Sequence, residues 1–125
     1  MASRLKTTEV AKVRNQMLAQ QGGRCAICKL PCSESQAVLD HDHGSGAIRA
    51  ALHRGCNALL GKLENNHKRY GVPSVHAFAN GVAAYLTQHT FNITGLLHPS
   101  YRSEDERRVA RNAKARATRA AKKET

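Results

Sequence analysis

The sequence lacks tryptophan and has few other large apolar side chains. Its 125 residues include three tyrosines and two phenylalanines, so the core has to be small and built from leucine, valine, isoleucine and alanine. This length suits one domain better than two. A domain so poor in large apolar groups often needs a cross-link or a bound metal, and four cysteines are available for that purpose.

Long hydrophobic runs are also missing. No stretch approaches the roughly 20 apolar residues that cross a bilayer, and the first twenty residues contain no apolar segment typical of a signal peptide. We therefore expect a cytoplasmic protein with no membrane partner. Because thiols stay reduced in that compartment, cysteines there more often bind metal or carry out redox chemistry than form disulfides.

Acidic residues are scarce, with nine against twenty lysines and arginines, and the net charge is +11. The excess is concentrated at the ends, because residues 1–24 carry +4, residues 25–100 carry +2 and residues 101–125 carry +5. A basic field of this size attracts polyanions and makes their binding sensitive to salt. It favours a nucleic acid as partner over the alternative of a merely soluble surface.

Two short pairs of metal-binding residues stand out: Cys25-x-x-Cys28 and His53-x-x-Cys56. Zinc takes four sulfur or nitrogen ligands in a tetrahedron, and two such pairs can supply them with little strain. Cys32 is a competing ligand, which leaves open a four-cysteine set with His53 free. A site closed by four protein ligands has no position for water, so this zinc would be structural.

A second polar cluster, Asp40-His41-Asp42-His43, precedes a Gly44–Gly46 turn, and Asn57 directly follows the second metal-binding pair. Phosphodiester hydrolysis uses a hard cation held by oxygen ligands and a base for the attacking water. Asp40 and Asn57 offer oxygens, and a histidine offers the base. A solvated loop is the alternative interpretation, and for Asp42 we expect solvation.

The geometry of that cluster poses a difficulty. In a regular strand Asp40 and His41 point to opposite faces of the sheet. Both can reach one phosphate only if the strand ends, bulges or twists at this point.

Hydrophobic spacing predicts the elements around these clusters. We expect a helix capped by Thr7 or Thr8 and ended by Gly22-Gly23, strands over residues 37–43 and 47–52, and a helix from about Arg54 to about Asn65. The apolar face of the first helix would be Val10, Val13, Met17 and Leu18, and the buried residues of the second would be Leu59, Leu60 and Leu63.

Two further helices are predicted downstream. One begins at Pro73 and carries an apolar stripe, expected in the core or in a subunit interface, made of Val75, Phe78, Val82, Tyr85 and Leu86. The other begins at Ser103, where Glu106 completes a capping-box pattern. This last segment has almost no apolar face, so we expect it to be disordered or partly helical until it meets an anion.

The succession Cys-x-x-Cys, Leu39-Asp40-His41-Asp42-His43, Gly46-x-Ile48-Arg49 and Cys56-Asn57, with Gly61, resembles the recombination endonuclease VII family of bacteriophages. That family belongs to the HNH, or His-Me finger, nucleases, and the similarity covers about residues 10–63. It implies a mainly α fold with a small β-hairpin, a zinc-stapled ββα-metal core flanked by helices.

The resemblance also implies roles for single residues. Asp40 and Asn57 match ligands of a catalytic Mg²⁺ (or Mn²⁺), His41 matches the general base, and His43 matches a second active-site histidine. The zinc ligands would be Cys25, Cys28, His53 and Cys56, although the family usually has cysteine at position 53. Some members carry an acid where this chain has Leu60. Arg49, Arg54 and Lys62 are candidate contacts to nucleic acid.

The implied function is a metal-dependent endonuclease that nicks duplex or branched DNA in the bacterial cytoplasm. A dimer that resolves four-way junctions is one variant, and a free-standing nicking enzyme is another. A non-catalytic, zinc-containing nucleic-acid-binding module is the alternative from another class. The expected parts are a basic arm and helix (1–24), the nuclease core (25–70), a packing or dimerisation segment (71–101) and a basic tail (102–125).

Overall fold

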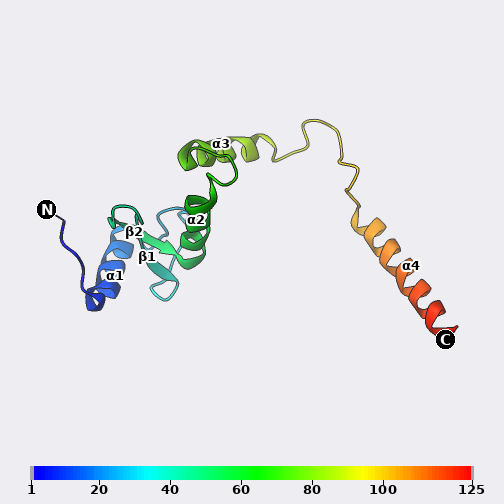
Figure 1. The fold of residues 1–125 in the computed structure, drawn as a ribbon, viewed down its shortest axis with the longest axis horizontal. Helices are drawn as coiled ribbons and strands as arrows, with labels where there is room; N and C mark the ends of the chain where they lie inside the picture. Colours follow the sequence, from blue (N-terminus) through cyan, green and yellow to red (C-terminus); the bar gives the residue numbers. More distant parts are fainter. Residues whose placement is uncertain (1, 125) are drawn as a thin grey trace. The chain divides into compact units, whose positions relative to one another are not determined.

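The structure, a computed structural model, describes residues 2–124 and divides the chain into two compact units, Met1–Val82 and Ala83–Thr125. The first unit contains a 3-10 turn (η1, Thr7–Glu9), helix α1 (Val10–Gln20), strands β1 (Ala37–His41) and β2 (Ile48–His53), and helix α2 (Arg54–Asn66). Helix α3 (Val75–Gln88) begins in the first unit and ends in the second, which also holds α4 (Glu104–Lys123) (Figure 1). About half of the chain is helical, as expected, and none of the described helices is long and apolar enough to cross a membrane.

Strands β1 and β2 form a two-stranded antiparallel hairpin that leads directly into α2, which confirms the expected strand–turn–strand–helix order. Asp42 organises the turn, because its Oδ1 accepts the backbone N–H groups of Gly44 (2.8 Å) and Ser45 (2.9 Å). These hydrogen bonds lower the pKa of Asp42. The expectation that Asp42 is simply solvated is therefore wrong. Gly46 completes the turn at a φ of 77°, which suits glycine.

The pairing of the two strands is interrupted opposite Asp40. Leu39 pairs with Ala51 and His41 pairs with Ile48, so one residue of β1 faces two residues of β2, Arg49 and Ala50. This two-for-one count is a β-bulge, which re-aims side chains on the strand with the extra residue. Strand β1 then ends at His41. The bulge and the strand end thus both occur at the place where the sequence required an irregularity.

The core of the first unit is small. Its buried hydrophobic side chains, among the described residues, are Leu18, Cys25, Cys32, Ala37, Ala51 and Leu52. Helices α1 and α2 both pack against the hairpin and lie on either side of it (Figure 1). Two of the six core side chains are cysteines, and a third cysteine, Cys56, packs against them. The core and the metal-binding pairs therefore occupy the same place.

Several local expectations need correction. Thr7 and Thr8 do not cap α1, because both lie inside η1, where Lys6 is the N-cap without a side-chain hydrogen bond. In α2, no side chain is fully buried. Leu60 and Leu63 follow Cys56 at helical spacing and are half-buried, whereas Leu59 lies off that face and is 64% exposed.

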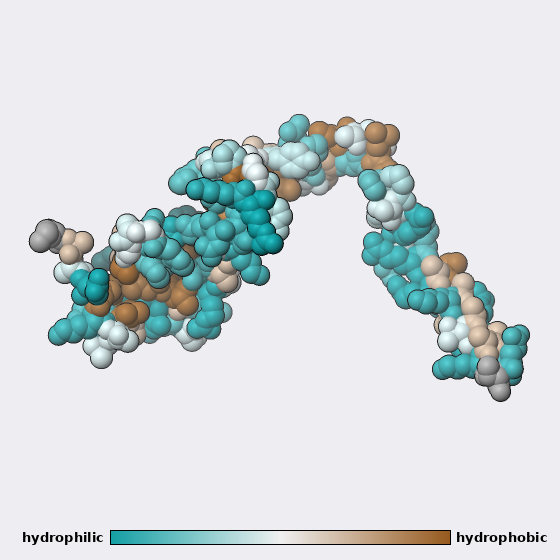
Figure 2. Space-filling view, in the orientation of Figure 1, coloured by the Kyte–Doolittle hydropathy of each residue, from teal (hydrophilic) through white to brown (hydrophobic). Residues whose placement is uncertain are grey.

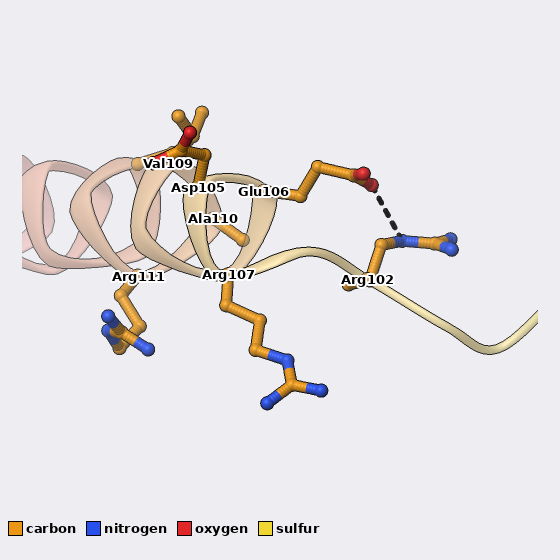
Figure 3. A pocket seen from close by; sticks show the side chains of 8 residues that line it. Arg102, Asp105, Glu106, Arg107, Val109, Ala110 and Arg111 are labelled. Carbon is orange, nitrogen blue, oxygen red and sulfur yellow. Dashed lines mark ion pairs between the residues drawn. The ribbon is translucent and has the colours of Figure 1, made fainter. Parts of the chain in front are cut away.

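The apolar stripe of α3 is exposed rather than in the core of this chain, with Phe78 at 43%, Tyr85 at 63% and Leu86 at 61%. Helix α4 is continuous over its twenty residues, and Ser103 caps it by accepting the Glu106 N–H at 3.1 Å. Figure 3 shows the pocket beside its first turns, where Arg102 pairs with Glu106 at 3.9 Å. In Figure 2 most of the visible α4 surface is hydrophilic.

Candidate metal centre and active site

The four predicted zinc ligands gather at one point. The donor atoms of Cys25, Cys28, His53 and Cys56 all lie within 4.8 Å of one another. Ligands at zinc distances occupy corners of a tetrahedron about 3.5–3.8 Å apart, so this cluster has the size and the donor chemistry for a structural zinc. Cys25 and Cys28 come from the loop after α1, His53 ends β2, and Cys56 lies in the first turn of α2.

His53 is oriented for ligation through Nδ1. Its Nε2 lies 2.9 Å from the carbonyl oxygen of Pro31, which can only accept, so Nε2 carries the proton and donates it. Nδ1 then keeps its lone pair and lies 3.2 Å from the Cys28 Sγ. A backbone carbonyl holding the distal N–H of a histidine is the usual outer partner of a metal ligand.

The charge state of the cysteines also suits a metal. Burial raises the pKa of the Cys25 thiol, but backbone N–H groups of Cys28, His53 and Ile27 and the His53 ring lower it further, and the net pKa is about 6. One of these bonds, from the His53 N–H to the Cys25 Sγ, measures 3.4 Å. Metal ligands must be deprotonated, and these hydrogen bonds stabilise a thiolate inside the core. By contrast, burial raises the pKa of Cys56 to about 11.

Cys32 lies outside the cluster. Its thiol donates to the Ser33 carbonyl oxygen at 3.6 Å, and burial followed by the nearby Cys25 and Cys28 raises its pKa. The structure therefore favours the set with His53 over the four-cysteine alternative. Lys29 shapes the intervening loop with a φ of 65°, unusual for a residue with a Cβ.

Asp40 is buried at the bulge and held by one guanidinium. Arg49 donates from Nε to Oδ2 at 2.7 Å and from Nη2 to Oδ1 at 3.1 Å, while its other edge contacts Glu64 at 3.0 and 3.1 Å. These contacts with Glu64 and then Asp40 raise the pKa of Arg49. The Arg49 side chain, which the sequence assigned to a phosphate, is thus engaged by two acids in this structure.

The two histidines lie on the exposed side of the same segment. The rings of His41 and His43 stack with centroids 4.8 Å apart and an angle of 16° between their planes. Both side chains are exposed, whereas Asp40 is only 6% exposed. His41 is accessible to a substrate, and its ring position is supported by His43.

The remaining predicted site residues lie along α2. Asn57 is half-buried and follows the metal-cluster residue Cys56 directly. Arg54 opens the helix, with its backbone N–H bonded to the Gln36 carbonyl oxygen at 3.0 Å, and its side chain is exposed. Lys62 is exposed and lines a groove that also includes Leu59, Tyr70 and Phe78.

Sequence reasoning missed Glu64 and Gln21. Glu64 follows Asn57 by seven residues, two helical turns, so a search for acids on the Asn57 face of α2 would have found it. Gln21 had no recognisable signal. Its side-chain amide bonds to both the N–H (2.9 Å) and the C=O (2.8 Å) of Ala51 in β2.

Together these features define a zinc-type strand–strand–helix protein with a cluster of acid and histidine residues at its hairpin. Comparison with protein families agrees, since the family model described as recombination endonuclease VII matches residues 2–87. The chain belongs to the recombination endonuclease VII family and is therefore a DNA endonuclease. No match was found among curated proteins.

Proposed function

We propose that the protein is an HNH-type nuclease that hydrolyses phosphodiester bonds of DNA with one divalent cation. The observation that carries this proposal is the junction at β1, where buried Asp40 adjoins exposed His41 at a bulge and a strand end. An acid fixed inside the fold beside an accessible base is the pairing that metal-assisted hydrolysis needs. Family membership supports the same reaction.

His41 is the proposed general base. Its exposed imidazole would take a proton from the attacking water as that water approaches phosphorus. His43, stacked on it at 4.8 Å, would hold the ring in place and face the scissile phosphate. Neutral imidazole is abundant near pH 7, so the reaction needs no unusual environment for the base.

Asp40 and Asn57 are the proposed ligands of Mg²⁺ or Mn²⁺, which when bound would stabilise charge on the leaving oxygen. Asp40 fits this role because its surroundings already hold a cation, the Arg49 guanidinium, against both of its oxygens. Asn57 adds an amide oxygen, a ligand that hard cations accept. The Cys25, Cys28, His53 and Cys56 cluster is the proposed structural zinc site.

DNA is the proposed substrate, branched or duplex, and the bacterial cytoplasm the proposed place of action. We assign residues 25–70 to the nuclease core, 1–24 to a basic arm and helix, 71–101 to packing or dimerisation, and 102–125 to a basic tail. Arg54 and Lys62 are exposed and suited to phosphate contacts. Four-way junctions suit paired cuts by a dimer.

A homodimer is proposed from the exposed apolar residues of the first unit. Leu59 (64% exposed), Tyr70 (80%) and Phe78 (43%) line one groove between α2 and the start of α3. Exposed apolar patches of this kind often mark interfaces. We expect Phe78→Asp to halve the mass measured by light scattering, whereas Phe91→Asp should not. A wild-type monomer would contradict the dimer and, with it, paired cutting.

The catalytic proposal is tested with zinc-loaded protein on four-way junction, nicked and linear duplex DNA, with Mg²⁺ added back after dialysis. We expect His41→Ala to lose at least about 100-fold in cleavage rate, the lower range for loss of a general base, while zinc content and DNA affinity are retained. His89→Ala, which changes an exposed histidine directly after α3, is the matched control. Full cleavage by His41→Ala would refute the assignment. Binding of DNA without cleavage by the wild type, in Mg²⁺ or Mn²⁺, would favour a non-catalytic zinc module.

A further inference from the structure

Asp40, Arg49 and Glu64 form a connected bridge of ion pairs from β1 through β2 to α2. The guanidinium contacts both oxygens of each acid, at 2.7 and 3.1 Å for Asp40 and at 3.0 and 3.1 Å for Glu64. All three nitrogens of Arg49 take part. The set contains two negative groups and one positive group, so it keeps one negative charge in excess.

The position of Arg49 matters because a fork of N–H donors and a metal ion seek the same oxygens. Arginine binds a carboxylate in two parallel hydrogen bonds, which are strong when one partner is sheltered from water. Asp40 is 6% exposed, so little of its carboxylate is open to solvent elsewhere. A divalent cation that binds Asp40 must therefore displace Arg49 from at least one oxygen.

Glu64 offers Arg49 a second anchor. The two side chains are about one-third exposed, at 32% and 35%, and an ion pair so exposed contributes little to stability by itself. Its effect is to hold the guanidinium. Glu64 lies two helical turns after Asn57, so one face of α2 presents both the proposed metal ligand and the anchor.

We infer that Arg49 is an internal cation that competes with the divalent metal for Asp40, and that Glu64 is a positioning residue that receives Arg49 when the metal binds. The inference rests on the proposed function, because it takes Asp40 as a metal ligand. Glu64 contacts neither metal nor substrate and acts only through Arg49.

The test measures Mn²⁺ affinity without DNA, by electron paramagnetic resonance of free Mn²⁺, on full-length zinc-loaded protein. We expect R49Q to bind Mn²⁺ on the order of tenfold more tightly than the wild type, since a competing cation is gone. E64Q should bind more weakly, because Arg49 then depends on Asp40 alone. The double variant R49Q/E64Q should match R49Q.

Controls separate this mechanism from general electrostatics and from misfolding. R69Q removes an exposed positive charge from the same unit and should leave the affinity unchanged. R49K keeps the charge without the fork and should bind Mn²⁺ more tightly than the wild type even if R49Q does not fold. If E64Q weakens binding equally with and without Arg49, Glu64 acts as a plain charge and the inference is overturned.

D40N distinguishes failure of the inference from failure of the proposed function. If D40N loses Mn²⁺ binding while R49Q and R49K bind as the wild type does, only the competition is refuted. If D40N binds Mn²⁺ as tightly as the wild type, Asp40 is no ligand, and the proposed metal site and the inference both fall.

Discussion

At the scale of single residues, Gln21 takes the place of a third strand beside β2. Its amide accepts the Ala51 N–H at 2.9 Å and donates to the Ala51 carbonyl at 2.8 Å, and it also donates to the Arg24 carbonyl at 2.8 Å. Ala51 is fully buried, and a buried backbone group without a partner is costly. Gln21 thus joins the end of α1 to the hairpin and to the loop that carries Cys25.

We predict that Gln21→Met lowers the free energy of unfolding by about 1–3 kcal/mol, the usual cost of leaving buried polar groups without partners. Gln20→Met, at the exposed end of α1, should change it by less than about 0.5 kcal/mol. Urea denaturation of the zinc-loaded proteins measures both. Equal stabilities for the two variants would show that Ala51 finds other partners.

Single residues also show how far the sequence can be interpreted. The spacing of Cys25, Cys28, His53 and Cys56 identified a metal cluster that the structure brings together, because zinc geometry restricts which spacings work. The partners of Asp40 were not predictable. Arg49 and Glu64 lie 9 and 24 residues away in sequence and meet it only through a bulge, and ordinary strand alternation gives no sign of a bulge.

At the scale of elements, α4 separates its charges along its length. Its three acids lie in the first turn, where they favour the helix dipole, and two of them pair with nearby bases, Asp105 with Arg108 at 3.1 Å and Glu104 with Arg111 at 3.3 Å. Beyond that turn the helix contains only basic charges, on an exposed surface. Twenty residues extend about 30 Å, close to one turn of duplex DNA.

We predict that α4 binds DNA phosphates through its basic side chains. The variant Lys114→Gln/Arg116→Gln/Arg119→Gln should reduce the slope of log affinity against log salt by up to about 0.9 for each phosphate that is no longer neutralised. Anisotropy of labelled duplex DNA across a NaCl series measures this slope.

The matched control for α4 is Ala113→Gln/Ala117→Gln/Ala120→Gln, which makes three substitutions in the same turns without changing charge. Its slope should equal that of the wild type. A similar reduction in both variants would mean that the helix itself, rather than its charge, was disturbed.

Elements were predicted well where periodicity is strong. The ranges expected for the hairpin and for α2 agree with the structure to within two residues. Burial within those helices was less predictable, because it depends on which face meets the hairpin. Leu59 and Leu63 are equally apolar, yet only Leu63 follows Cys56 at a spacing that turns it inward. The irregular chain after α3 offered no periodic signal.

At the scale of the whole molecule, the first unit depends on its metal cluster more than on its core. The six buried hydrophobic residues described above include two cysteines, and the largest fully buried side chain is Leu52. Structural zinc supplies on the order of 10 kcal/mol, which is comparable to the entire stability of an ordinary domain. Metal binding and folding should therefore be one event in this unit.

We predict that Cys28→Ser loses zinc and its cooperative unfolding transition, whereas Cys32→Ala retains one zinc per chain. Cys28 is an exposed member of the cluster, and Cys32 lies outside it. Zinc content by atomic emission and thermal unfolding by circular dichroism measure the two effects. Zinc loss from Cys32→Ala with retention in His53→Ala would instead support the four-cysteine set.

The bulge at Arg49 and Ala50 has a consequence for comparing this chain with others. Because two residues there face one, the in–out parity of β2 changes at that point, and a relative without the extra residue would carry every later side chain in the opposite phase. An alignment that treats the hairpin as regular would therefore match Arg49 to a residue on the wrong face. Residues in this strand correspond between relatives only when they are counted from His53 backward on one side of the bulge and from the Gly44–Gly46 turn forward on the other.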